Sequence, residues 1–473
     1  MKIMVKFNLF TTIAVVGIAS LLGGCNKNEE QVNVSIPFFK VGQAVSTKTP
    51  LNGPIKGTLL SDSVYRVSGD VFINENDTLV IQPGARIHFP GNATYSFVVN
   101  GSLFSLGTEA KPIYFTVPTA QRTDTYGADP TTDPAYKGLW GGILGDKTFK
   151  NIVIKWTHIE FGGGKLGTSP VSFLANGTNT YNISTANPNG ILVVEDSWVY
   201  GGVDDPIRPF GCKFNVMRNT FEKGGFTGGE SMNIKSGTTG IFAYNLIIGS
   251  ATNGPKASNN GGRNPQTEVQ MYNNTIICSG FRRNSSGRGG SLNFEEGSKG
   301  VYYNNLMVNC KYGPRVVGAT ANYNGNALVV ADTANIKGGY NFNYVDSLYI
   351  ANEIYPTGFS TKPNANDIPA PSSFLPATYK PGQVYDGKAV LGKNNPDFMN
   401  FPLPQTTKRM GDVSSMGTFN FRLKPTSPAI GKGYTGFSAL SVVPVSANFG
   451  ATILTPPNKD IGAYPSDNSG NKH

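Results

Sequence analysis

The chain of 473 residues contains 58 glycines and 31 prolines, and only 15% of its residues are charged. This composition is typical of a β-rich protein with many turns and argues against a helical one. The formal net charge is +10. Because no known nucleic-acid-binding module is recognisable, we expect an anionic partner other than nucleic acid.

The first 24 residues have the features of a targeting segment. Lys2 and Lys6 precede an apolar stretch at residues 9–22, which is too short to span a bilayer. The stretch leads into Leu22-Gly23-Gly24-Cys25, which resembles the lipobox of bacterial lipoproteins. That resemblance implies that residues 1–24 are a lipoprotein signal peptide and that Cys25 is acylated and anchors the protein in a membrane.

The residues after Cys25 bear on the location of the protein. Asn26 stands where an aspartate would signal retention in the inner membrane, and Glu29-Glu30 resembles the acidic export tag of some Gram-negative lipoproteins. We therefore expect a lipid-anchored protein of the outer membrane, exposed at the cell surface. Residues 25–56 are predicted to be a flexible tether that lifts the fold off the membrane.

Strand-sized apolar pieces separated by turn residues follow the tether. They lie at residues 67–73, 78–84, 86–89, 98–103, 111–116 and 138–143. This succession resembles the opening coils of right-handed parallel β-helix proteins of the pectate-lyase-like superfamily. Residues 117–137 interrupt it and are predicted to form a polar surface loop, in which calcium binding by the aspartates is an alternative without the ligand pattern of an EF-hand.

A short phrase recurs through residues 191–318: an apolar run, a small polar residue, and another apolar run. Its polar marker positions are Asp196, Asn219, Asn245, Asn274 and Asn305, preceded upstream by Thr157. The markers are spaced by 23, 26, 29 and 31 residues, intervals that indicate a solenoid or a propeller. The units are too short for a propeller blade and lack amphipathic helical stretches. Stacked coils would place the markers in a ladder along one corner.

The C-terminal part departs from this rhythm and then closes the fold. Residues 351–465 are predicted to be an irregular region with closing coils, and residues 466–473 a tail. Residues 421–433 and 459–464 resemble the closing motif of β-helix proteins on bacterial surfaces. We therefore predict an all-β, right-handed parallel β-helix (solenoid) at residues 57–350, with N-terminal cap coils and a C-terminal irregular cap.

One stretch carries a possible catalytic motif. Glu230 to Ser236 resembles the Glu-x-x-x-x-Lys-Ser segment of the alginate and chondroitin lyase family. The resemblance implies that Lys235 is the catalytic base and Glu230 a calcium ligand. This chain has Gly228 where the family has a second glutamate, and it offers Lys256 or Arg263 in place of an arginine acid. Strand alternation predicts that Lys235 and Glu230 point to opposite faces unless the chain turns near Gly229.

A basic loop is the preferred ligand-binding surface. Between residues 256 and 315 there are eight basic residues and three acidic ones. Forked guanidinium groups and flat aromatic rings suit the carboxylates and rings of acidic sugars. The residues predicted to bind are Arg282, Arg283, Arg288, Tyr272 and Tyr302. Asp204-Asp205 with Arg208 is a further constellation, either a solvated turn or a carboxylate pair for acid–base chemistry or calcium.

Three functions remain open from the sequence. The leading hypothesis is a surface lipoprotein that binds a polysaccharide or another anionic ligand, without a cofactor. The alternatives are a polysaccharide lyase acting on uronic-acid-containing glycans, for which calcium is a possible cofactor, and a structural adhesin or stalk. Cys278 and Cys310 follow their markers at similar positions in consecutive coils, so a disulfide and two stacked thiols are both compatible with the sequence.

The lipobox generates a test of membrane anchoring. Changing Cys25 to Ser removes the acylation site, so we expect the protein to leave the membrane fraction or to keep its signal peptide, because acyl chains supply the membrane affinity. Cell fractionation followed by immunoblotting measures this. A variant that fractionates and is processed like the parent would contradict the assignment of Cys25.

Overall fold

The computed structural model describes residues 41–123, 130–283, 290–317, 321–323, 326–328, 330–351, 388, 391–405, 410–444 and 454–473. The predicted signal peptide and Cys25 lie outside these ranges. Among the described residues, no helix is both long and apolar enough to cross a membrane.

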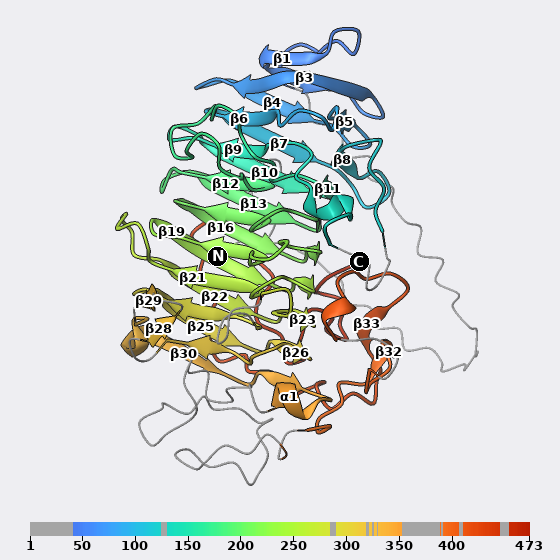
Figure 1. The fold of residues 1–473 in the computed structure, drawn as a ribbon, viewed down its shortest axis with the longest axis vertical. Coiled ribbons are helices and arrows are strands. Elements are labelled where there is room, and N and C mark those ends of the chain that lie inside the picture. The colour runs from blue at the N-terminus through green and yellow to red at the C-terminus, as the bar shows by residue number, and fades with distance from the viewer. Residues whose placement is uncertain are drawn as a thin grey trace, which may run out of the picture. The chain divides into compact units, whose positions relative to one another are not determined.

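Three parallel sheets, here named A, B and C, run along a stack of coils, so the predicted parallel β-helix is confirmed (Figure 1). Each complete coil contributes one strand to sheet A, then one to sheet C and one to sheet B. Strands pair in parallel with their counterparts in the next coil, as in β10 with β13 and β13 with β16.

Sheet A consists of β2 (Gly57–Leu59), β4 (Thr78–Ile81), β7 (Ser102–Leu106), β10 (Asn151–Lys155), β13 (Ile191–Glu195), β16 (Cys212–Met217), β19 (Thr238–Ala243), β22 (Glu268–Tyr272), β25 (Lys299–Tyr303) and β30 (Ile336–Gly339). Sheet B consists of β1 (Leu51–Pro54), β3 (Val64–Ile73), β6 (Ser96–Val99), β9 (Gly142–Gly145), β12 (Ile183–Thr185), β15 (Ile207–Pro209), β18 (Met232–Ile234), β21 (Pro255–Ser258), β24 (Asn293–Glu295) and β27 (Arg315–Val316).

Sheet C shares β3 with sheet B and continues with β5 (Arg86–His88), β8 (Ile113–Thr116), β11 (Thr157–Glu160), β14 (Trp198–Tyr200), β17 (Thr220–Glu222), β20 (Leu246–Ile248), β23 (Thr275–Ile277), β26 (Leu306–Val308) and β31 (Phe342–Tyr344). Two antiparallel pairs, β28 (Ala321–Tyr323) with β29 (Asn326–Leu328) and β32 (Phe398–Asn400) with β33 (Asn420–Leu423), lie outside these sheets. The described helices are short: η1 (Pro134–Tyr136), η2 (Thr333–Asn335), α1 (Leu348–Ala351) and η4 (Met410–Asp412).

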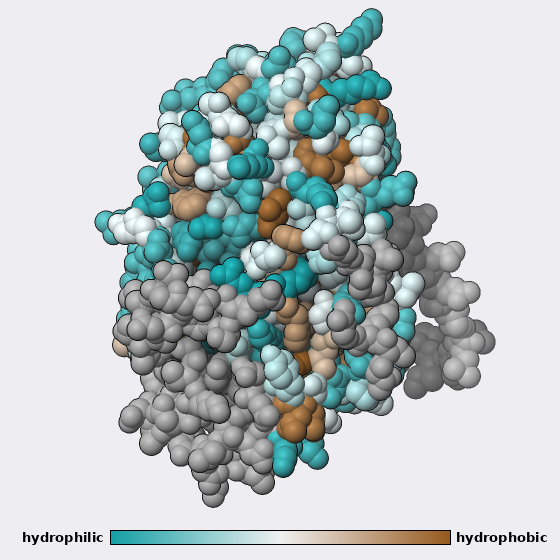
Figure 2. Space-filling model, in the orientation of Figure 1, coloured by the Kyte–Doolittle hydropathy of each residue, from teal (hydrophilic) through white to brown (hydrophobic). Residues whose placement is uncertain are grey.

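The core lies inside the coils, where alternate side chains of every strand point. Register stacks these apolar side chains in columns. One column on sheet A runs Ile154, Val194, Val216, Phe242, Met271 and Tyr302. Each such side chain contributes about 1.5–3 kcal/mol by leaving water. The outside is mostly hydrophilic in the view of Figure 2, with hydrophobic residues in small separate groups.

The predicted polar ladder forms at the turn from sheet A to sheet C. Its asparagines are bonded side chain to side chain from coil to coil: Asn219 to Asn245 (3.0 Å), Asn245 to Asn274 (3.2 Å), Asn274 to Asn305 (2.9 Å) and Asn305 to Asn341 (3.0 Å). Each amide also donates to a main-chain carbonyl, as Asn274 does to Phe242. All five side chains are buried with their hydrogen bonds satisfied.

The marker assigned to Asp196 is wrong by one residue. Ser197 occupies the ladder position, since its N–H donates to Asn219 Oδ1 at 3.0 Å and its hydroxyl accepts from the N–H of Thr157. Asp196 has φ +50° and is the turn residue that precedes the ladder, like Arg218 (φ +59°) and Tyr244 (φ +56°) in the next two coils. Asp196 instead pairs with Arg218 at 2.7 Å.

The ordered fold begins before residue 57. Leu51, in the range assigned to the tether, is buried in the core because β1 pairs with β3. Cys278 and Cys310 are both buried free thiols.

The described part of the insertion at residues 117–137, which was predicted to be a polar surface loop, is tied to sheet C by buried ion pairs. Arg122 reaches the buried carboxylates of Glu160 and Glu222, and Asp133 pairs with the buried ammonium of Lys223. Asp133 also caps η1 by accepting from the N–H of Ala135. These buried ion pairs fix the insertion on the outer side of sheet C.

The C-terminal strap, residues 454–473, runs back along the stack (Figure 1). It touches successively earlier coils: Asn304 donates to Asn458 (3.2 Å), Asn273 to Asp460 (2.6 Å), and Asn471 to Asn219 (3.0 Å). His473 then stacks on Trp198 with ring centroids 3.8 Å apart. The strap therefore connects coils that are not neighbours in the stack.

The ladder predicts a large cost for removing one of its members. Asn274→Leu leaves the amide of Asn245 and the carbonyl of Phe242 buried without their partner, so we expect a loss of about 2–3 kcal/mol in unfolding free energy. Denaturant unfolding measures it. As a control, the exposed Asn335→Leu should stay within about 0.5 kcal/mol of the parent. Equal stability of Asn274→Leu and the parent would show that the ladder contributes nothing.

Candidate functional site

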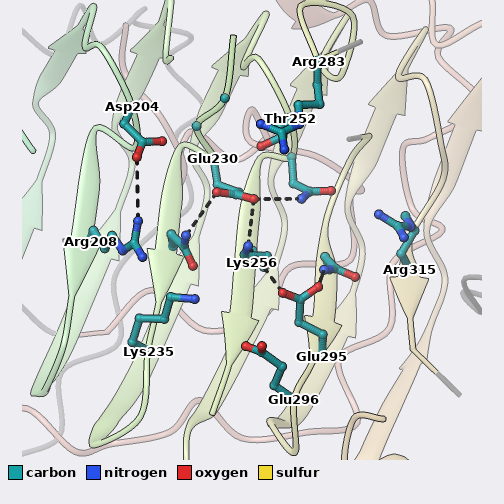
Figure 3. Close-up of a pocket in the computed structure, with 15 residues that line it drawn as sticks. Asp204, Arg208, Glu230, Lys235, Thr252, Lys256, Arg283, Glu295, Glu296 and Arg315 are labelled. Carbon is teal, nitrogen blue, oxygen red and sulfur yellow. Dashed lines mark hydrogen bonds and ion pairs between the residues drawn. The ribbon is translucent and has the colours of Figure 1, made fainter. Parts of the chain in front are cut away.

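A polar pocket of about 260 Å³ on the outer face of sheet B is the strongest candidate site (Figure 3). Its walls contain five basic and four acidic side chains. The lining residues are Asp204, Arg208, Gly228, Gly229, Glu230, Asn233, Lys235, Thr252, Asn253, Lys256, Arg283, Asn293, Glu295, Glu296 and Arg315.

A column of in-register side chains forms the floor of this pocket. From coil to coil it runs Arg208, Asn233, Lys256, Asn293 and Arg315. Their strand neighbours Ile207, Met232, Ala257, Phe294 and Val316 are buried in the core. Side chains alternate between the two faces of a strand, and these apolar neighbours point into the core. The polar column therefore points outward. Cations thus alternate with amides along about four interstrand spacings.

Glu230 enters the pocket from a turn that precedes β18. Gly229 has φ +125°, and a Cβ there would lie 2.8 Å from the main chain of Asp204, so the turn requires glycine. The N–H of Glu230 donates to Asp205 Oδ1 at 2.7 Å. The turn takes Glu230 out of the alternation of β18. It therefore lines the same pocket as Lys235, although strand alternation alone would place the two side chains on opposite faces.

The centre of the pocket is an ion-paired group. Lys256 Nζ lies 3.0 Å from Glu230 Oε1 and 3.4 Å from Glu295 Oε1. Burial opposes the charge on each of the three groups, but the attraction between Lys256 and the two carboxylates outweighs it. The pKa of Lys256 is therefore raised, and the pKa values of Glu230 and Glu295 are lowered. All three groups are charged at neutral pH.

Two aspartates and Arg208 border this centre. Arg208 Nη1 lies 3.2 Å from Asp205 Oδ2 and 3.8 Å from Asp204 Oδ2. Asp205 is fully enclosed and also accepts from Asn233 Nδ2 at 2.9 Å. Burial and the charge of neighbouring Asp204 raise the pKa of Asp205 well above its ordinary range. The pair is therefore built into the site, unlike a solvated turn.

Lys235 lies just after β18, with Nζ 3.4 Å from Ser258 Oγ. Burial, followed by the positive charges of Lys256 and Arg208, lowers the pKa of Lys235 to about 8. A substantial fraction of this amine is therefore neutral near physiological pH, which an exposed lysine is not.

The two described arginines of the basic loop take different roles. Arg283 lines the pocket, and its Nη1 lies 3.1 Å from where a Cβ on Gly228 would be. Arg282 turns away and donates to the carbonyls of Gly224 (2.8 Å) and Gly225 (2.7 Å), with its guanidinium over the ring of Tyr136. Arg282 thus holds the neighbouring loop and does not line the pocket. Arg288 lies outside the described residues.

Tyr272 and Tyr302 do not belong to this surface. Both lie on sheet A, whereas Arg282 follows β23 of sheet C. Tyr272 is fully buried and donates its hydroxyl to the carbonyl of Thr455 at 2.8 Å, under the C-terminal strap. Tyr302 points into the core against Phe294. Both rings are covered, and neither tyrosine lines the pocket.

The surroundings of Glu230 do not fit a calcium ion. Calcium prefers a shell of oxygen atoms, but Glu230 Oε1 faces Lys256 Nζ and Asn253 Nδ2, and Oε2 accepts from Asn233 Nδ2. Within the described ranges, no group of three or more His, Cys, Asp or Glu side chains is arranged to hold a metal. The ammonium group of Lys256 supplies the positive charge at the place expected for the metal.

Several lining residues have buried polar atoms without a partner among the described residues. They are the Oδ1 atoms of Asn233, Asn253 and Asn293, Thr252 Oγ1, and the Nε atoms of Arg208 and Arg283. An unpaired buried polar group costs about 1–3 kcal/mol. A ligand rich in hydroxyl groups supplies both donors and acceptors for such atoms.

Sequence reasoning missed Asn253, Asn293, Glu295 and Arg315 as site residues. A signal existed in the polar residues of the column, which are flanked by apolar ones at coil-like intervals, as in Met232-Asn233-Ile234 and Leu292-Asn293-Phe294.

Comparison with models of protein families, with curated proteins and with solved structures found no match to this chain.

Proposed function

We propose that this protein binds an acidic glycan in the sheet B pocket. The observation that carries the proposal is that the cationic side chains of Arg208, Lys235, Arg283 and Arg315 line one pocket together with amides that have unpartnered polar atoms. The cations attract carboxylates, and the amides and Thr252 suit the hydroxyl groups of a sugar.

The walls of the pocket favour a saccharide over an apolar ligand. None of the fifteen lining residues has an aliphatic or aromatic side chain. An apolar molecule would leave the charged groups desolvated without compensation. A polyhydroxylated chain lying along the sheet instead replaces water hydrogen bonds one for one.

Membrane anchoring through Cys25 remains part of the proposal. A lipid-anchored protein of the outer membrane, exposed at the cell surface, would meet polysaccharides outside the cell, and the basic balance of the chain suits an anionic partner. A purely structural adhesin or stalk is the less favoured alternative, because such a role does not require a pocket with buried charges.

A lyase activity is the second candidate, and the lowered pKa of Lys235 favours it. In such a reaction the neutral amine of Lys235 takes the proton at C5 of a uronate. The electron pair left behind forms the C4–C5 double bond, and the C4–O bond breaks. The departing oxygen takes a proton from water in the cleft. Nearby Arg208 and Lys256 stabilise the negative charge that develops.

The binding proposal is tested by removing two cations from the pocket. We expect the double variant Arg283→Gln, Arg315→Gln to bind an acidic oligosaccharide at least about tenfold more weakly, since each charge-assisted hydrogen bond contributes about 1.5–3 kcal/mol. Calorimetry in low salt measures the affinity. The control Lys56→Gln, Lys111→Gln removes two exposed cations near the start of the fold and should bind like the parent. Equal affinities of the two double variants would place binding elsewhere.

The lyase candidate predicts a pH profile. Lys235 acts as a base only when neutral, so product formation should rise about tenfold per pH unit below about pH 8 and level off above it. Ultraviolet absorbance of the unsaturated product measures the rate. Lys235→Met should abolish it, whereas Lys213→Met, at an exposed position of β16, should not. A parent that binds glycan but yields no unsaturated product at any pH would leave binding as the function.

A further inference from the structure

We propose that Gly228 is a specificity-determining residue of the sheet B pocket. Because it has no side chain, a sugar ring can lie across it with a carboxylate on Arg283 and a hydroxyl group on Asp204. This inference rests on the proposed function, since it concerns the ligand of the same pocket. The surroundings of Gly228 carry it.

The main chain does not require a glycine at position 228. Gly225 and Gly229 have φ of +75° and +125°, which other residues rarely adopt, whereas Gly228 does not adopt such a φ. Among the described residues outside its own turn, only two atoms lie within 4 Å of where a Cβ on Gly228 would be. They are Arg283 Nη1 at 3.1 Å and Asp204 Oδ1 at 3.9 Å, both at the ends of side chains. A side chain here would therefore enter the pocket between a cation and a carboxylate.

Gly228, Asp204 and Arg283, here named the Gly228 surface, form an accessible part of the pocket. Each of the three is partly exposed, whereas Glu230 and Lys256 in the centre are buried. Figure 3 shows Asp204 and Arg283 on either side of the turn that leads to Glu230. A ligand that arrives from solvent can therefore reach the Gly228 surface without displacing the buried ion pairs.

Arg283 is the cation of this surface that is available to a ligand. Among the described residues, no carboxylate lies within ion-pair distance of its guanidinium, and its Nε is buried without a partner. Arg208 and Lys256, by contrast, are each already paired with two carboxylates. A guanidinium binds a carboxylate through two parallel hydrogen bonds. The carboxylate of the ligand is therefore assigned to Arg283.

Asp204 fixes the orientation of the ring. Its carboxylate repels the carboxylate of the ligand but accepts hydrogen bonds from hydroxyl groups. The ring therefore binds with its acidic group towards Arg283 and its hydroxyl groups towards Asp204. A neutral ring gains only the contacts with Asp204, so the Gly228 surface discriminates between acidic and neutral sugars.

Arg282 holds the two sides of this surface in place. Its guanidinium donates to the three carbonyls of residues 224–226, in the loop that leads to Gly228. The next residue, Arg283, donates its N–H to the carbonyl of Ala251 at 3.1 Å. Because main-chain contacts hold both segments, a Cβ on Gly228 has to displace the guanidinium of Arg283 itself.

The test fills the space above Gly228. Gly228→Ala places a Cβ 3.1 Å from Arg283 Nη1, so the guanidinium must move. Calorimetry at about pH 6, where Lys235 is protonated and cannot act as a base, measures the affinities for trigalacturonate and for its carboxyl-reduced form. We expect the preference for the acidic probe to fall at least about fivefold. Gly167→Ala should keep the preference of the parent. It is a matched control, because Gly167 is exposed and no atom of another described segment lies within 4 Å of its Cβ position.

A second variant shows whether Gly228 acts through Arg283. Arg283→Gln should lower the preference by itself, and adding Gly228→Ala should lower it no further. Additive losses, an equal loss of affinity for both probes in Gly228→Ala, or an unchanged preference in that variant would overturn the inference and leave the proposed function standing. A parent that does not prefer trigalacturonate to its carboxyl-reduced form would contradict the proposed function, and the inference with it.

Discussion

Main-chain hydrogen bonding between coils in register is the interaction on which the rest of the structure depends. It fixes each residue above a counterpart one interstrand spacing away, so a coil cannot choose its side chains independently of its neighbours. Inside the stack this gives apolar columns, such as the one through Val194, Val216 and Phe242. At the corner it gives the asparagine ladder, where each amide satisfies the next coil.

The same constraint creates the electrostatic problem that the pocket resolves. An outward column of like charges would be repulsive, but amides separate Arg208, Lys256 and Arg315, and carboxylates from turns reach in beside them. Glu230 does so only because the turn at Gly229 frees it from the strand. Behind the pocket wall, Arg282 ties the loop at residues 224–226 to Tyr136 of the insertion. A segment far from the pocket in sequence thus supports one of its walls.

The fold was predictable because its determinants are local and repeated. Spacing and strand-sized apolar runs identify the coils without knowledge of any contact. They also locate the ladder to within one residue, since Asp196 was assigned the position that Ser197 occupies. The site was predictable only in part. The family-like stretch indicated Glu230 and Lys235, but Lys256 and its two partners lie in three different coils whose lengths vary. The surroundings of Tyr272 and Tyr302 were not predictable, because sequence does not show that Tyr302 faces the core and that Tyr272 is covered by the strap.

The C-terminal strap changes how the stack of coils can unfold. An array of coils held by nearest-neighbour contacts can fray from either end, one unit at a time. Residues 454–473 contact Asn304, Asn273, Asn219 and Trp198 in turn. They therefore couple the unfolding of coils that are separated by several steps. The strap is also synthesised after every coil that it touches. Coils can therefore stack in the order of synthesis, but the middle of the stack becomes a cooperative unit only when the strap has returned along it.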